Sequence, residues 1–148
     1  PIMPVSIPIT ENMMSSIAEQ QTSASAVEVR KGLPVIGGTV DNQVKPIATG
    51  TSTILDTIEG IAQDDANDGA TTRVAVAGQI CIARVKGTVT RGDSLICKTG
   101  STTDAENGSL EAQATIVNGD LIVAKALEDG TDQSYIKVVV QLYRVTAA

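Results

Sequence analysis

The chain lacks the residue type that most often performs catalysis. None of its 148 residues is histidine, the commonest general base and a frequent metal ligand. Ser-His-Asp and Cys-His nucleophilic arrangements are therefore excluded, and the glycines form no phosphate-binding pattern. Carboxylate chemistry remains open, with Asp64, Asp68 and Glu128 as candidates. We expect no catalytic residue and no cofactor, and hence no enzyme.

One acidic cluster could be interpreted as a calcium site. It consists of Asp64, Asp65, Asn67, Asp68 and Gly69. The alternation of oxygen ligands that an EF-hand requires breaks at Ala66, and no Glu stands twelfth from either Asp64 or Asp65. A polar turn between two strands explains the same residues. We predict the turn and no metal site.

Two cysteines, Cys81 and Cys97, each lie inside an apolar run. Free cysteine behaves as a small buried hydrophobe, so we predict two buried reduced thiols, with a disulfide as the alternative. A metal site would need further ligands at close spacing.

Arg91-Gly92-Asp93 spells an adhesion tripeptide, but the Gly-Asp pair also fits a turn, which we predict instead.

The composition favours strands and a partner. The apolar residues are mostly Val, Ile, Ala and Leu, and the only aromatic residues are Tyr135 and Tyr143. A core of small aliphatic side chains buries less area per residue, so we expect self-association or docking to add stability.

The net charge is −6 with scattered Lys and Arg, which argues against binding to nucleic acid. No run approaches the ~18 apolar residues that span a bilayer.

Turn signals divide the chain after residue 25 into short apolar runs. Glycines recur at the ~8–12-residue spacing typical of all-β barrels and sandwiches. We predict an all-β fold, a single barrel or sandwich of short antiparallel strands, at residues 26–148. The candidate strands are Ala26–Arg30, Val44–Ala48, Ile54–Ala62, Arg73–Ala77, Gln79–Val85, Leu95–Lys98, Glu111–Val117, Asp120–Leu127 and Tyr135–Arg144.

Three of these strands carry a more detailed expectation. Asn118-Gly119 readily adopts the positive φ angles of a type I′ turn, so it predicts a hairpin between Thr115–Val117 and Asp120–Val123. Alternation in Tyr135–Arg144 predicts one buried face with Ile136, Val138, Val140 and Leu142. Gln79–Val85 is apolar on nearly both faces, which predicts a central strand or a subunit contact.

The first 25 residues differ from the rest. All five prolines lie within the first 46 residues, and Pro4 and Pro8 alternate with apolar residues, which predicts an extended arm. Such an arm can add a strand to a neighbour's sheet edge; the alternative is that it packs on its own barrel. The candidate anchors for a partner are Ile2, Val5, Ile7, Ile9, Met13 and Met14.

Several short elements follow one another in a particular order. Gly60-Ile61-Ala62 precedes the acidic turn and the strand Val74–Ala77. Val89–Leu95 has the pattern V-x-x-G-D-x-L, and Ile136–Val140 has the pattern I-K-V-x-V. This order resembles that in the head decoration (capsid cement) proteins of tailed bacteriophages, whose G-x-A-L-E-D element is matched by Val123–Gly130, with Ala124 at the glycine. The resemblance covers residues 26–144, and residues 1–25 match no known element.

This resemblance implies a β-barrel, often a homotrimer, bound to the outer surface of the major capsid lattice. The implied partners are the major capsid protein and other copies of the chain, without nucleic acid or membrane. The implied location is the virion, assembled in the host cytoplasm. The alternative is a head or tail fibre domain for receptor or glycan adhesion, although only Tyr135 and Tyr143 could serve as aromatic platforms.

Overall fold

The computed structural model describes residues 20–23, 29–37, 43–47, 58–67, 69–97, 109–113 and 115–146, with the backbone alone at 20–23. Among these residues there are ten strands and no helix, which confirms the all-β prediction. No helix of this part of the chain is therefore long and apolar enough to span a membrane. The strands are β1 (Gln20–Ser23), β2 (Pro34–Gly37), β3 (Gln43–Pro46), β4 (Ile58–Ala62), β5 (Thr71–Ala75), β6 (Ile80–Arg84), β7 (Ser94–Cys97), β8 (Leu110–Ala112), β9 (Leu121–Ala126) and β10 (Tyr135–Arg144).

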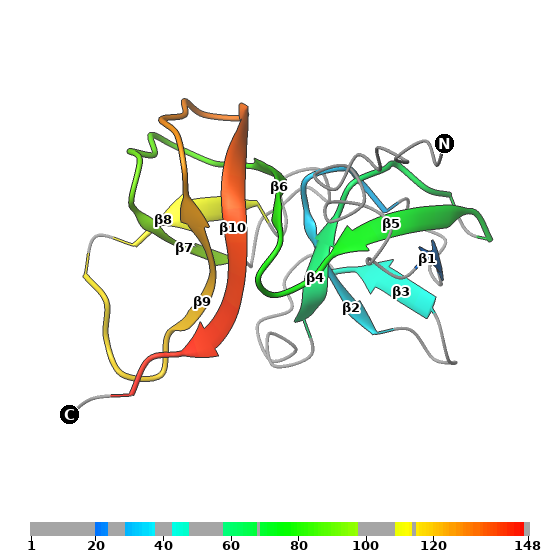
Figure 1. Ribbon diagram of the computed structural model, residues 1–148, viewed down its shortest axis with the longest axis horizontal. Coiled ribbons are helices and arrows are strands. Elements are labelled where there is room, and N and C mark those ends of the chain that lie inside the picture. Colours follow the sequence, from blue (N-terminus) through cyan, green and yellow to red (C-terminus); the bar gives the residue numbers. More distant parts are fainter. Residues whose placement is uncertain are drawn as a thin grey trace, which may run out of the picture.

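The first five strands close into a barrel in the order β1-β3-β2-β4-β5 (Figure 1). Strand β1 completes it, running antiparallel to β5 and parallel to β3. The predicted arm 1–25 included Gln20–Ser23, and the structure assigns those four residues to the barrel wall. Residues 1–19 lie outside the described residues, so an arm there stays a prediction.

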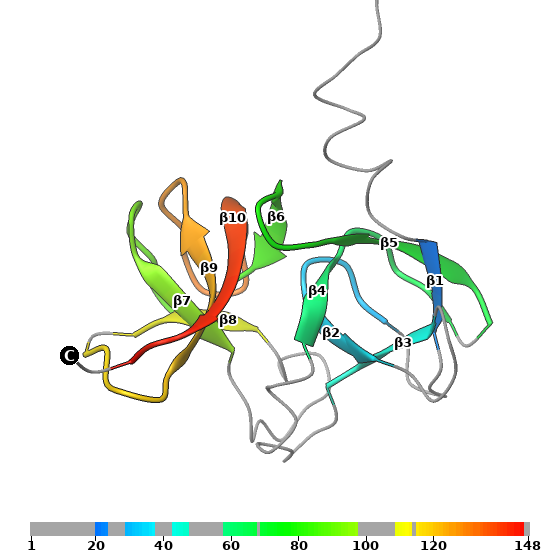
Figure 2. The ribbon, with the colours of Figure 1, turned by 60° about the horizontal axis from the view of Figure 1, so that its bottom comes forward.

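The last five strands form a second sheet in the order β6-β10-β9-β7-β8. Its two end strands meet where Val85 and Leu110 form an isolated parallel bridge, and the Lys86 N–H donates to the Leu110 carbonyl at 2.8 Å. The sheet is therefore rolled toward a second barrel. Both views place it beside the first barrel, with β6 at the boundary (Figures 1 and 2).

Strand β6 is an end strand, so its predicted central position is wrong. Its outer edge is covered by the first barrel instead of by another strand. The Gln63 side chain donates to the Ile82 carbonyl at 3.1 Å and accepts the Ile82 N–H at 3.2 Å. Gln63 thus replaces a strand's peptide group, because its amide offers one donor and one acceptor in the same plane.

A shared apolar core joins the two sheets. One cluster of buried side chains includes Ile58 and Ile61 from the barrel together with Leu95, Val123 and Val138 from the second sheet. A smaller cluster fills the barrel itself. It consists of Val29, Val35, Val44, Ala62, Ala66 and Val74. Burial of this continuous core is the main force that holds the two sheets together.

The predicted hairpin at Asn118-Gly119 is wrong, because 115–117 is not a strand. A turn is present, but it is not the predicted type I′, which needs a positive φ at both residues: Gly119 has a φ of +95°, whereas the φ of Asn118 is not positive. Strand β9 already pairs with β7 on one side and β10 on the other. The turn instead joins the end of β10, since the Gly119 N–H donates to the Val145 carbonyl at 2.8 Å.

The final strand follows its predicted bounds and most of its predicted alternation. Ile136, Val138 and Val140 are buried, and Lys137 is exposed. The register then shifts between Val140 and Tyr143, and Leu142 has a φ of +52°. This β-bulge places Tyr143 opposite Ile122 and redirects the end of the strand.

Candidate partner-binding surfaces

The predicted anchoring residues cannot be placed. Ile2, Val5, Ile7, Ile9, Met13 and Met14 all lie outside the described residues. The candidate surfaces must therefore come from the barrel, the second sheet and their loops.

Asp64, Asp65, Asn67 and Gly69 of the acidic cluster lie in the predicted connection between β4 and β5, and Asp68 lies outside the described residues. Arg73 donates from Nε to Asp64 Oδ2 at 2.8 Å and from Nη2 to Asp64 Oδ1 at 2.9 Å. These hydrogen bonds hold the pKa of the Asp64 carboxyl below its usual value. Asp65 accepts the Lys31 N–H at 2.8 Å. Across the described ranges, no group of three acidic, cysteine or histidine residues is placed to hold a metal ion.

Both cysteines are buried free thiols, as predicted. Burial raises the pKa of Cys81 and of Cys97 to about 12. Since the thiolate is the nucleophilic form, neither side chain is suited to covalent chemistry near neutral pH.

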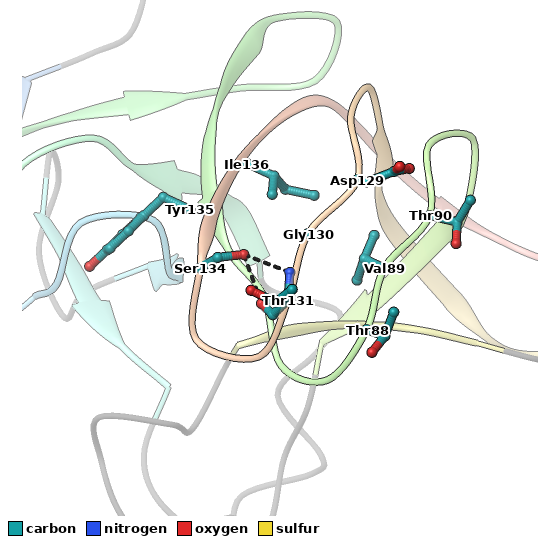
Figure 3. Close-up of a pocket in the computed structure, with 9 residues that line it drawn as sticks. All are labelled: Thr88, Val89, Thr90, Asp129, Gly130, Thr131, Ser134, Tyr135 and Ile136. Atoms are coloured by element: carbon teal, nitrogen blue, oxygen red, sulfur yellow. Dashed lines mark hydrogen bonds between the residues drawn. The ribbon is translucent and has the colours of Figure 1, made fainter.

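An open surface hollow of about 420 Å³ lies where the loop before β7 meets the loop before β10. Val89 and Gly130 join these loops through two backbone hydrogen bonds of 2.9 and 2.8 Å. Figure 3 shows Thr88 and Thr90 on one loop and Thr131 and Ser134 on the other, with the Tyr135 ring extending away from both threonines of the first loop.

The polar groups around the hollow mostly organise the loops. Ser134 Oγ accepts the Thr131 N–H at 3.0 Å and donates to the Thr131 carbonyl at 2.7 Å, as the dashed lines of Figure 3 show. Asp129 accepts the Arg91 N–H at 2.8 Å. Asp93 accepts the Thr90 N–H at 2.9 Å, which closes the predicted Gly-Asp turn around Gly92, at φ +94°. This arrangement fixes loop shape and brings no acid–base pair together.

A second surface, the distal apolar end, consists of Ile116, Val117 and Tyr143. These side chains are 40%, 51% and 48% exposed. Asp120 fixes the loop by accepting the Val117 N–H at 3.0 Å. The Gly119 N–H donates to the Val145 carbonyl at 2.8 Å, so the loop lies against the end of β10, the strand that carries Tyr143. Exposed apolar side chains on neighbouring segments make this end a candidate interaction surface.

Sequence reasoning missed this surface because it assigned Ile116 and Val117 to a strand. Their apolar β-branched side chains are typical of a strand. One feature of the sequence argues against a strand here: polar and apolar residues do not alternate along Thr115–Val117.

No protein-family model matches the chain. No curated protein sequence matches it either.

Among solved structures, the chain is similar to the head fibre gp8.5 N base of bacteriophage phi29. The TM-score is 0.58 and the sequence identity is 14%, and the alignment covers 86% of this chain and 98% of that chain. At this identity the likeness shows a common fold. It extends over nearly the whole of the phi29 base.

Proposed function

We propose that this protein is a structural component of a phage head that binds the outer capsid surface and cements neighbouring capsid subunits, without catalysis. The observation that carries the proposal is the fold similarity to the phi29 head fibre base, which covers 98% of that chain. The order of sequence elements, which resembles capsid decoration proteins, supports it independently.

The physical properties of the described residues fit attachment to a large surface. The turns are fixed by backbone-to-carboxylate hydrogen bonds, such as those accepted by Asp93 and Asp129. The distal apolar end offers exposed Ile116, Val117 and Tyr143. A rigid body with a small apolar surface can bind repeated lattice sites, because little conformational entropy is lost on docking.

A second candidate function is the base of a head fibre. The same structural similarity favours it, since the phi29 protein is such a base. In that case the fold would attach to the head and carry a further adhesive part, and receptor binding would lie elsewhere.

Binding and calorimetry on empty shells separate these functions. The shells are assembled from the major capsid protein of the phage that encodes this chain. A cement protein binds to saturation and raises the melting temperature of the shells, because a ligand of the native state shifts unfolding. A fibre base that contacts one capsid subunit at each site stabilises that subunit alone, so it should raise the melting temperature less than a protein that bridges neighbouring subunits. Absence of shell binding by the full chain would contradict both.

A further inference from the structure

The dipeptide Asn118-Gly119 carries chemistry that the proposed function does not use. Asn-Gly occurs in the chain at 107–108 and at 118–119, and 107–108 lies outside the described residues. Asn118 and Gly119 are both exposed, in the loop between β8 and β9 that runs beside the end of β10 (Figures 1 and 2). Ile116 and Val117 of the distal apolar end directly precede the dipeptide.

An asparagine followed by glycine can lose ammonia through attack by its own backbone. The glycine nitrogen gives up its proton and forms a bond to the asparagine Cγ, and the side-chain amide nitrogen leaves with a proton as ammonia. Water then opens the resulting succinimide ring to aspartate or isoaspartate, without any oxidant or reductant. Glycine permits this ring closure best, because it has no Cβ and its backbone adopts conformations that other residues avoid.

The end of β10 engages the nitrogen that would attack. The Gly119 N–H donates to the Val145 carbonyl at 2.8 Å, and the Val145 N–H donates to the Asp120 carbonyl at 2.8 Å. Arg144 Nη1 donates to the Gly119 carbonyl at 2.7 Å. These hydrogen bonds hold the proton on the Gly119 nitrogen and fix its peptide plane, so ring closure requires that the end of β10 first move away.

Pairing holds the end of β10 less firmly than the rest of the strand. Its ladder with β6 stops at Val139. Beyond the bulge, its ladder with β9 contains only the pairs Tyr143–Ile122 and Arg144–Leu121. Segments with few backbone partners open locally at a lower free energy than the core of a sheet, so residues 143–145 should open more often than residues 136–140.

We propose that Asn118-Gly119 is a deamidation site that the end of β10 holds closed and that local opening of residues 143–145 releases. Water is the only co-reactant. The aspartate product places a negative charge beside Ile116 and Val117, and the isoaspartate product also adds one methylene group to the backbone of the loop. The reaction does not depend on binding to shells, so it is tested on the isolated protein.

Peptide mapping by mass spectrometry, on protein kept in warm and mildly alkaline buffer, measures deamidation at position 118. The folded parent should react at least about fivefold more slowly than the parent in concentrated urea, a factor that corresponds to the about 1 kcal/mol of one net hydrogen bond. Deletion of residues 144–148 removes the contacts of Arg144 and Val145, and this folded variant should react at least about fivefold faster than the folded parent. The matched control lacks only residues 147–148, keeps both contacts and should react as the parent does.

Amide hydrogen exchange of the parent tests the same hydrogen bond without any variant, and it decides the question where the deletion of residues 144–148 abolishes the circular dichroism of the sheet. The Gly119 amide should exchange at least about fivefold more slowly than in an unstructured peptide of the same sequence. An unprotected Gly119 amide, equal rates at position 118 in the folded and urea-unfolded parent, or a folded deletion variant as slow as the parent would each overturn the role of β10. Absence of deamidation at position 118 in urea would overturn the site itself.

Discussion

At the scale of single residues, close packing between strands requires a glycine at position 60. A Cβ atom there would lie 2.1 Å from the Ala75 carbonyl oxygen and 2.8 Å from Val74 Cγ1. Both neighbours belong to β5, which is fixed in the barrel by pairing with β4 and β1. The element Gly60-Ile61-Ala62 therefore has a steric reason for beginning with glycine.

Replacement Gly60→Ala should destabilise the protein by about 1–3 kcal/mol, the usual cost of overpacking a core. Urea denaturation measures this change. The control is Gly69→Ala, where nothing lies within 4 Å and only the φ of +86° opposes the side chain. That substitution should cost about 1–2 kcal/mol through backbone strain. If Gly60→Ala left the free energy of unfolding unchanged, the result would contradict the close packing of β4 against β5 at Gly60.

The two buried thiols should make the protein less stable at high pH. The pKa of Cys81 and Cys97 is raised from 9.0 to about 12 by burial. A raised pKa of this kind contributes stability that is fully present below pH 9 and is lost as pH rises toward 12. The melting temperature should therefore fall between pH 9 and pH 11, measured by circular dichroism.

The control for this pH dependence is the variant Cys81→Ala/Cys97→Ala, whose melting temperature should vary less over the same range. Tyr135 and Tyr143 are about half exposed and remain in both proteins. An identical pH dependence in the parent and the variant would contradict the assignment to the thiols.

At the scale of elements, strand β1 is necessary for closing the barrel. Thr22 pairs with Gln43 of β3 and Thr71 of β5, so without β1 both neighbours would have unpaired edges. A protein lacking residues 1–25 should melt at a lower temperature than one lacking only residues 1–19, because the longer deletion also removes β1. Differential scanning calorimetry compares the two. Equal melting temperatures would mean that β1 adds nothing to the barrel.

The distal apolar end makes a separate prediction about binding. Val117→Asp adds a charge to an exposed side chain and should weaken shell binding by at least about tenfold, since a desolvated charge at an interface costs more than 1.4 kcal/mol. Thr115→Asp adds the same charge two residues away and serves as the control. Sedimentation with shells measures both variants. Equal binding by both would place the attachment surface elsewhere.

Local patterns predicted most strands but not their pairing. The bounds of β10 follow directly from its alternation, and the cysteines and acidic turn follow from residue type. Strand β2 is absent from the predicted strands, although it begins at Pro34 and proline is tolerated at the first position of a strand. The hairpin failed for a different reason: the partners of β9 are set by strands far away in sequence, which no local turn signal encodes.

The binding surfaces were harder to predict than the fold. The distal apolar end depends on the bulge at Leu142, and a positive φ at leucine has no sequence signal. Gly32, Arg84 and Tyr135 are about 50 to 100 positions apart in the sequence and meet only after the two sheets have packed. The predicted arm residues were chosen from composition alone and stay a prediction.

At the scale of the whole molecule, a closed barrel and a rolled sheet share one core. Gln63 covers the edge of β6, and the Val85–Leu110 bridge joins the ends of the second sheet. Covered edges limit uncontrolled strand addition between copies. Such a body suits a component present at high local concentration on a shell, where indiscriminate edge pairing would cause aggregation.

The most direct measurement is electron cryomicroscopy of empty shells that have been saturated with the 148-residue protein. We expect additional density on the outer surface, of a size that fits the barrel and the second sheet together, touching more than one capsid subunit. Shells without such density, at protein concentrations that saturate any binding, would contradict the claim that this protein is a structural component of the phage head.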